Sequence, residues 1–260
     1  MVYYVAYKAS TDFRNRSRVV RHLRSLGCRQ IRRSLWMVKR GSIGAAARLL
    51  QPNHPVILKR TKELRKPSRT KTRAKELGTL IIIALKSPKE ENRSRIRSLF
   101  SRAPCIRLCH GVYAFSQWHR HFDKEQKLAD AWSFQESLRD IGEEAIIIPK
   151  LVAVGHGSTM RLLGKAEERV QDEITSIIEG YRSLGMEVGR AGFDERNARN
   201  KARKLRKRLR TIREISIFYR RWLKVDQSNL LIRPYSIIKK TKTLLEEKYE
   251  TIGVQSAEAV

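Results

Sequence analysis

The stretch Asn15-Arg16-Ser17-Arg18 recurs as Asn92-Arg93-Ser94-Arg95, 77 residues further along the chain. The same shift aligns Cys28 with Cys105, and it aligns two short apolar runs that follow these cysteines. Self-similarity at a fixed spacing is typical of a duplicated structural unit. We therefore expect the first part of the chain to contain two copies of one fold.

Both copies show the same succession of apolar runs and amphipathic segments, in the order strand, helix, strand, strand, helix, strand. The elements expected in the first copy are strands at 2–9, 29–33, 35–40 and 56–58, a helix at 14–26 and a short helix that ends at Leu50. Those expected in the second copy are strands at 80–85 and 145–154, a hairpin at 105–116, and helices at 91–103 and 128–141. The order βαββαβ is that of the ferredoxin-like fold.

The region beyond the second copy has its apolar residues at helical spacing. Ser158 is the expected N-cap of its first helix, residues 185–192 are expected to interrupt that helix, and a further helix is expected over 195–224. The sequence thus predicts an α+β protein in which two tandem ferredoxin-like (βαββαβ) domains precede an α-helical C-terminal region. The expected boundaries are 1–64 for domain 1, 65–78 for a basic linker, 79–155 for domain 2 and 156–260 for the helical region. Within the linker, Lys66-Pro67-Ser68 is the expected flexible point.

The charge balance indicates the class of partner. The 260 residues contain 56 Lys and Arg against 26 Asp and Glu, and the formal net charge of +30 favours a polyanion such as nucleic acid. Because 41% of the residues are hydrophobic, the chain can bury real cores. The longest apolar run, 79–85, is too short for a membrane span, and three unclustered cysteines suit a reducing compartment. We expect a cytoplasmic protein without a membrane partner.

Basic residues gather in three clusters: the first helix, the linker, and a ridge on the helix after residue 195. A helical wheel places Arg14, Arg18 and Arg21 in a row opposite the apolar stripe of their helix, whereas only one of the three equivalents in the second copy is basic. Such a row can meet successive phosphates, and the alternative is a merely solvated face. The residues predicted to contact nucleic acid are Arg14, Arg16, Arg18, Arg21, Arg32, Arg33, Arg65, Lys66, Arg69, Lys71, Arg73, Lys75, Lys201, Arg203, Lys204, Lys207 and Arg208.

Duplex DNA is favoured over structured RNA as the partner. A ferredoxin-like sheet can read RNA through aromatic residues, but that signature is missing from the third strand of both copies, at 35–40 and 112–117. Trp118 and Trp132 could stack on bases, although Trp132 lies in an amphipathic helix, where core packing is the commoner role. Binding is therefore expected to rely mainly on phosphates.

Two family resemblances point in the same direction. Over residues 1–64, the opening strand, the helix start at 15–18 and the turn Arg33-Ser34-Leu35-Trp36 resemble the CRISPR spacer-acquisition nucleases and the related domain of the phenylacetate repressor PaaX. Residues 79–222 resemble the N-terminal region of the chromate-resistance regulator ChrB, through the stretches 138–145 and 205–212. Members of these families bind or act on nucleic acid, so the resemblance implies a DNA-binding protein, with transcriptional regulation as its natural role.

The nuclease resemblance also shapes what we expect of catalysis. Those nucleases place an Asp at the end of the first strand, where it holds a divalent metal. The corresponding positions here are Lys8 and Leu85, neither of which can ligate magnesium. The nearest carboxylate, Asp12, suits a helix N-cap or a pair with Arg. We therefore expect no enzymatic activity and no cofactor.

No other metal site is expected. The spacing of one cysteine and three histidines, Cys109, His110, His119 and His121, matches no standard zinc pattern. Cys28 and Cys105 follow helix ends at equivalent places, which suits small buried packing residues.

The sequence thus predicts a non-catalytic nucleic-acid-binding protein, with two alternatives open. One is a residual metal-dependent nuclease. The other is a structural component of a ribonucleoprotein or CRISPR-type assembly, in which the helical region docks a protein. Ferredoxin-like units often pair through their sheet edges, so the two copies can pair within one chain or build a homo-oligomer.

Overall fold

The computed structural model describes residues 1–68, 76–86, 88–117, 128–188 and 194–257. Two compact units share the chain. The first contains Met1–Ala166 and Phe218–Val225, and the second contains Glu167–Ile217 and Asp226–Val260. The mixed α/β class and the helical C-terminal region are confirmed.

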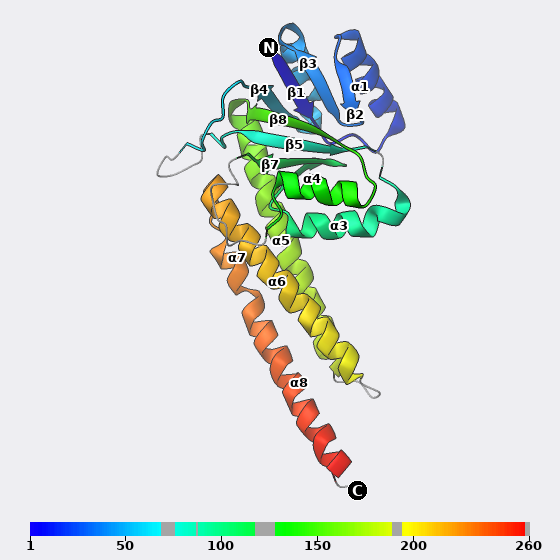
Figure 1. Cartoon of the computed structure of the whole chain (residues 1–260), viewed down its shortest axis with the longest axis vertical. Helices are drawn as coiled ribbons and strands as arrows, with labels where there is room; N and C mark the ends of the chain where they lie inside the picture. Colours follow the sequence, from blue (N-terminus) through cyan, green and yellow to red (C-terminus); the bar gives the residue numbers. More distant parts are fainter. Residues whose placement is uncertain (69–75, 87, 118–127, 189–193, 258–260) are drawn as a thin grey trace. The chain divides into compact units, whose positions relative to one another are not determined.

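The first unit is built on one antiparallel sheet of eight strands, in the order β2-β3-β1-β4-β8-β5-β7-β6 (Figure 1). The strands are β1 (Val2–Ala6), β2 (Arg29–Arg32), β3 (Leu35–Lys39), β4 (Val56–Arg60), β5 (Leu80–Leu85), β6 (Ile106–Cys109), β7 (Val112–Ser116) and β8 (Ala145–Ala153). Residues 1–60 therefore follow the predicted order of strands and helices, and so do residues 80–153.

Each half of the sheet has two helices packed on it. They are α1 (Phe13–Ser25) and α2 (Ile43–Leu50) in the first half, and α3 (Arg93–Arg102) and α4 (Ala131–Asp140) in the second. Short 3₁₀ turns flank α2 and precede α3: η1 (Arg40–Ser42), η2 (Gln51–Asn53) and η3 (Glu90–Asn92). The core of the first half centres on Trp36 and Leu23, and that of the second on Phe115 and Phe134. Because strand residues alternate between faces, every second residue of β1 and β5 contributes to these cores.

Strand registers repeat between the halves with one difference. In the first half Tyr3 is opposite Val38, and in the second Ile81 is opposite Phe115. The third strands are thus related by a shift of 77 residues, but the first strands by a shift of 78. The sequence alignment of Lys8 with Leu85 is therefore wrong by one residue: Lys8 is equivalent to Lys86, and Tyr7 to Leu85. Neither corrected pair contains a carboxylate.

The two halves join through their last strands. β4 and β8 pair in antiparallel fashion, with Leu58 opposite Ala153 and Arg60 opposite Leu151. The strand order on one side of this pair mirrors the order on the other, so corresponding edges of the two halves meet. This internal pairing uses the β4 and β8 edges, and the outer strands are β2 and β6.

The sheet face opposite α1 to α4 is also buried. Tyr4, Leu58, Ile82 and Ala114 on that face are at most 5% exposed. Residues 155–166 of α5 (Gly155–Val188) and 218–223 of α6 (Glu195–Leu223) belong to the same unit, and their large apolar side chains, such as Trp222, are buried.

Hydrogen bonds hold these two helix ends in the first unit. The Tyr219 hydroxyl donates to the Cys105 carbonyl at 2.6 Å, and the Trp222 indole N–H donates to the Leu77 carbonyl at 2.9 Å. The Ser158 hydroxyl accepts the main-chain N–H of Ile57 at 3.0 Å. Ser158 is therefore not the N-cap that the sequence predicted, because α5 begins at Gly155 and the hydroxyl is used for the contact with β4.

The second unit consists of the remaining parts of α5 and α6 together with α7 (Ser228–Ile232) and α8 (Pro234–Ala257). A Cβ on Gly180 of α5 would lie 2.6 Å from the Leu205 side chain of α6, so this glycine allows the two helices to approach closely. The Thr241 hydroxyl of α8 donates to the Tyr181 carbonyl of α5. The predicted interruption at 185–192 is wrong at its start, since α5 continues through Gly185 to Val188 and residues 189–193 lie outside the described part.

Within the described ranges, no helix combines the length and the apolar character needed to cross a membrane.

Candidate nucleic-acid interface

Helix α1, the first of the predicted basic clusters, has well-defined ends. The Asp12 side chain accepts the Arg14 main-chain N–H at 2.9 Å, which satisfies a free donor of the first turn. At the other end Gly27 takes a φ of +70°, and the Cys28 N–H returns to the Leu23 carbonyl at 3.0 Å. Of the two roles expected for Asp12, a helix N-cap or a pair with Arg, the structure shows the N-cap.

Arg14, Arg18 and Arg21 lie in a row on the outer face of α1, and all three are exposed. Together with Phe13, Ser17 and His22 they line a shallow hollow between the side chains of this face. The helix contains no acidic residue, and among the described residues no carboxylate forms an ion pair with the row. These guanidinium groups are therefore available for an external anion.

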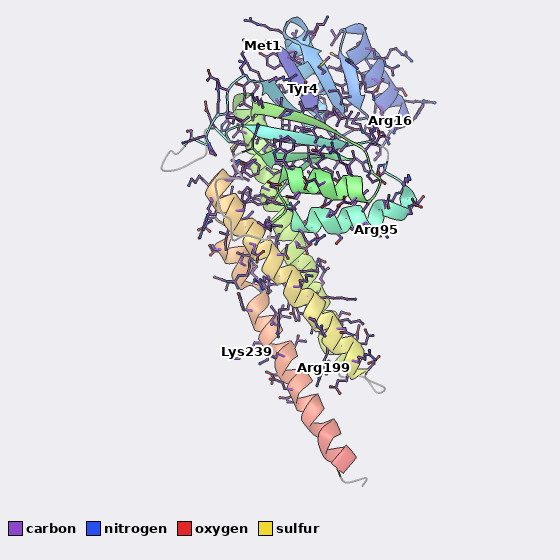
Figure 2. All side chains as sticks on the ribbon, viewed as in Figure 1. Met1, Tyr4, Arg16, Arg95, Arg199 and Lys239 are labelled. Carbon is purple, nitrogen blue, oxygen red and sulfur yellow. The ribbon has the colours of Figure 1, made fainter. Side chains whose placement is uncertain are left out.

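Arg16, which is also predicted to contact nucleic acid, lies apart from that row. It is half-buried, and its guanidinium carbon lies 5.2 Å from the centre of the Phe13 ring, within the range of a cation–π contact. Burial raises the pKa of the nearby Tyr7 hydroxyl, and the charges of Arg33 and Arg16 act in the opposite direction. Figure 2 labels Arg16 on α1.

The β2–β3 hairpin and the linker carry the next predicted residues. Arg32 is half-buried in β2, and Arg33 is exposed in the turn that follows. Arg65 and Lys66 are exposed, each with an interaction within the protein. Four further predicted residues lie outside the described ranges: Arg69, Lys71, Arg73 and Lys75.

The segment at 66–68, which the sequence predicts as the flexible point of the linker, is hydrogen-bonded to the chain that follows the linker. The Ser68 N–H donates to the Glu76 carbonyl at 3.0 Å, and the Thr79 N–H donates to the Arg65 carbonyl at 2.9 Å. Gly78, with a φ of +70°, packs so closely that a Cβ there would lie 2.7 Å from the Arg65 carbonyl oxygen. Hydrogen bonds and the close packing of Gly78 thus hold the two ends of the basic segment together, and the composition of the segment does not predict these contacts.

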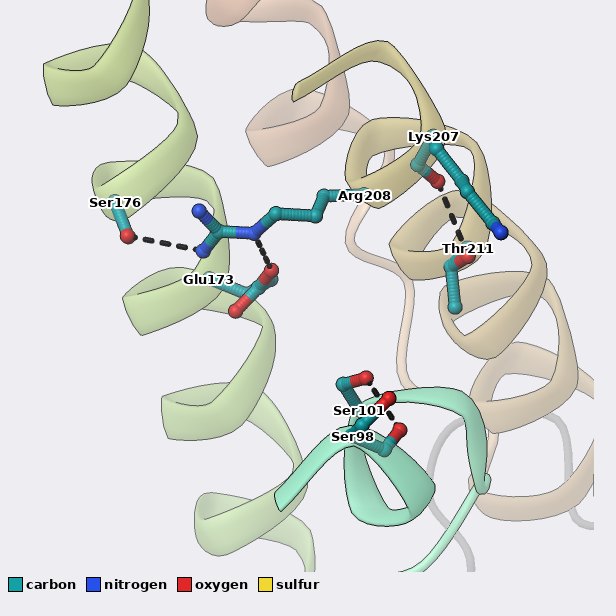
Figure 3. A network of polar contacts seen from close by, with 7 residues as sticks. All are labelled: Ser98, Ser101, Glu173, Ser176, Lys207, Arg208 and Thr211. Atoms are coloured by element: carbon teal, nitrogen blue, oxygen red, sulfur yellow. Dashed lines mark hydrogen bonds and ion pairs between the residues drawn. The ribbon is translucent and has the colours of Figure 1, made fainter. Parts of the chain in front are cut away.

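The basic ridge on α6 divides into two groups, both in the second unit. Lys201 pairs with Glu187 at 2.7 Å. Figure 3 shows the second contact, in which Arg208 donates to Glu173 at 2.8 Å and to Ser176 at 3.0 Å. The other three, Arg203, Lys204 and Lys207, are exposed and have no acidic partner among the described residues. Lys201 and Arg208 therefore join α6 to α5, and only the second group is open to an external anion.

Charge is distributed very unequally between the halves of the sheet. Residues 1–60 contain fourteen Lys and Arg residues and a single acidic residue, Asp12. Residues 80–153 contain twelve Lys and Arg residues and nine acidic residues. The positive field of the first unit is therefore concentrated on the half that carries α1.

The structure leaves little of the sheet surface exposed for contacts with nucleic-acid bases. The sheet face that ferredoxin-like RNA readers use is covered in this chain, as the burial of Tyr4 and Ile82 shows. Trp132 on α4 is 38% exposed, so it is less buried than its amphipathic helix suggested. Trp118 lies outside the described residues.

Phe13 is a candidate that sequence reasoning missed. Its ring is 68% exposed at the start of α1, beside the arginine row. The signal was present in the sequence, because Phe13 lies well away from the centre of the apolar stripe that Val19, Leu23 and Leu26 define on a helical wheel.

Metal ligands do not gather in the part of the chain that the structure describes: no group of three His, Cys, Asp or Glu residues is close enough to hold an ion. His119 and His121 lie outside that part. Cys28, Cys105 and Cys109 are all buried, and burial raises the pKa of the Cys109 thiol to about 12. None of these thiols is poised as a nucleophile.

The chain matches no family model, no curated protein and no solved structure with which it was compared.

Proposed function

We propose that this chain is a non-catalytic nucleic-acid-binding protein that holds duplex DNA through its phosphates, with the arginine row of α1 at the centre of the interface. The observation that carries the proposal is the exposed row of Arg14, Arg18 and Arg21 on a helix without acidic residues. A row of exposed cations without nearby carboxylates produces a local positive potential, which favours a polyanionic partner.

The dimensions of the row suit a duplex. Seven residues separate Arg14 from Arg21, which at about 1.5 Å per residue gives a row about 10 Å long. The major groove of B-DNA is about 12 Å wide, so long arginine side chains can reach phosphates at its border. Phosphate contacts of this kind give affinity without sequence readout.

The architecture supports a finer assignment within this proposal. The strand orders β2-β3-β1-β4 and β6-β7-β5-β8 are each that of a ferredoxin-like unit, and we infer two tandem modules joined through β4 and β8. The resemblance of the sequence to PaaX and ChrB supports a role in transcriptional regulation. A residual nuclease is less well supported, because neither Tyr7 and Leu85 nor Lys8 and Lys86 supply a carboxylate.

A structural role in a nucleoprotein assembly is the second candidate. It is favoured by Ile232 and Tyr235 of the second unit, which are 64% and 44% exposed and suit contact with a protein.

The deciding experiment measures the affinity for a DNA duplex over a range of salt concentrations. Replacing Arg14, Arg18 and Arg21 together by Ala should lower the salt slope by up to about three, since each phosphate contact contributes about 0.9. A charge-matched control replaces Arg97, Arg102 and Arg139, which are exposed on α3 and α4, and should leave the slope unchanged. Equal losses in both variants, or binding that does not depend on salt, would contradict the proposal.

A further inference from the structure

We infer that Phe13 is a stacking platform for an unpaired base of the bound nucleic acid. The inference rests on the proposed function and adds which part of the nucleic acid, an unpaired base, Phe13 contacts. It starts from the ring itself, which is 68% exposed at the start of α1.

The surroundings of Phe13 select the chemistry of its partner. The ring borders the hollow whose other walls include Arg14, Ser17 and Arg18. An apolar protein surface would meet these guanidinium groups at a desolvation cost, whereas a nucleotide presents a flat aromatic base beside a phosphate. Aromatic rings flanked by cations are the usual platform for unstacked bases.

Arg16 prepares the ring for this contact. Its guanidinium lies over one side of Phe13, 5.2 Å from the ring centre, while the ring also lines the hollow. The cation–π contact holds the ring in one orientation, so less side-chain entropy is lost when a base stacks on it. This gives Arg16 a role that differs from the phosphate contact expected from the sequence.

The base must be unpaired for the contact to form. Bases within a continuous duplex are stacked on their neighbours and present only their edges in the grooves, whereas an overhang, a frayed end or a flipped base presents a face. The inferred ligand is therefore a duplex whose phosphates lie along the arginine row and whose strand end or opened base reaches Phe13.

Two probes separate stacking from phosphate binding. One is a DNA duplex with a short thymine overhang, and the other is the same duplex with an abasic overhang, which keeps the phosphates and removes the bases. The protein should bind the thymine probe roughly 5- to 150-fold more tightly, the range expected for stacking of one base. Phe13→Ala should abolish this preference and Phe13→Trp should retain it. Trp132→Ala, a change at another exposed aromatic side chain, should retain it as well.

Each outcome bears on the inference. Equal binding of both probes by the unmodified protein, or a preference that survives Phe13→Ala, overturns it. If both probes still bind with a steep salt dependence that the arginine row controls, the proposed function stands without the stacking platform. If neither probe binds, the proposed function fails as well. Because Phe13 is exposed, Phe13→Ala and Phe13→Trp should melt at the temperature of the unmodified protein.

Discussion

The thiol of Cys109 lies 3.7 Å from the main-chain carbonyl oxygen of Ser34 and donates to it. Cys109 ends β6 at one edge of the sheet, and Ser34 lies in the turn between β2 and β3 at the other edge. Five strands lie between β3 and β6 in the sheet order, so the sheet must curve strongly for these residues to meet. The contact thus links the end of β6 to the turn between β2 and β3.

Cys109 should make stability fall in alkaline solution. Burial raises its pKa from 9.0 to about 12, so between these values the unfolded chain loses a proton that the folded chain keeps. The free energy of unfolding should then fall with rising pH above 9, by at most about 1.4 kcal/mol per pH unit. The free energy of unfolding of the Cys109→Ala variant should fall less steeply with pH, as measured by urea denaturation between pH 8.5 and 10.5. Equal slopes for both proteins would show that the thiol ionises without unfolding.

Gly78 should tolerate substitution less well than Gly142, although both have a φ close to +70°. A Cβ on Gly142 meets nothing within 4 Å, so Gly142→Ala should cost only the left-handed conformation, about 1 kcal/mol. Gly78→Ala adds overlap with the Arg65 carbonyl, and the total should be about 3 kcal/mol. Urea denaturation measures both. Similar losses for the two variants would mean that the ends of the linker are not fastened as described.

Arg208 and Arg203 should respond oppositely to substitution. Arg208 is partly buried and bonded to Glu173 and Ser176, so Arg208→Ala should lower the free energy of unfolding by about 1 kcal/mol and leave the salt slope of DNA binding unchanged. Arg203→Ala should leave stability unchanged and lower the slope by about one if the exposed part of the ridge contacts a phosphate. Thermal melts and salt titrations distinguish these effects. A lower slope for Arg208→Ala would show that its ion pair opens on binding.

Asp12 should act as a cap and not as a metal ligand. Asp12→Ala should lower the free energy of unfolding by about 1 kcal/mol, whereas Asp12→Asn should preserve it, because the amide oxygen can accept the Arg14 N–H. The unmodified protein should show no magnesium- or manganese-dependent cleavage of DNA or RNA above a contaminant control. Cleavage that disappears in Asp12→Asn would make this carboxylate catalytic and overturn the non-catalytic proposal.

Local patterns predicted most of the individual elements. The apolar run of β5, the Gly27 stop and the Asp12 cap depend on neighbours within a few residues, so they could be recognised in the sequence. The arginine row was likewise predicted by helical spacing alone. Ser158 was misassigned because its hydroxyl bonds to Ile57, about a hundred residues away, and such a partner leaves no local signal.

The sequence by itself determined the duplicated order of strands and helices, the charge and the outward row of Arg14, Arg18 and Arg21, because periodicity and composition act over short distances. Tertiary structure alone decided that the two halves share one sheet through β4 and β8, and that Lys201 and Arg208 are paired with carboxylates. These features depend on which distant surfaces meet. Strand pairing at a sheet edge, burial and ion pairing arise only when distant segments pack together, so no single segment determines them.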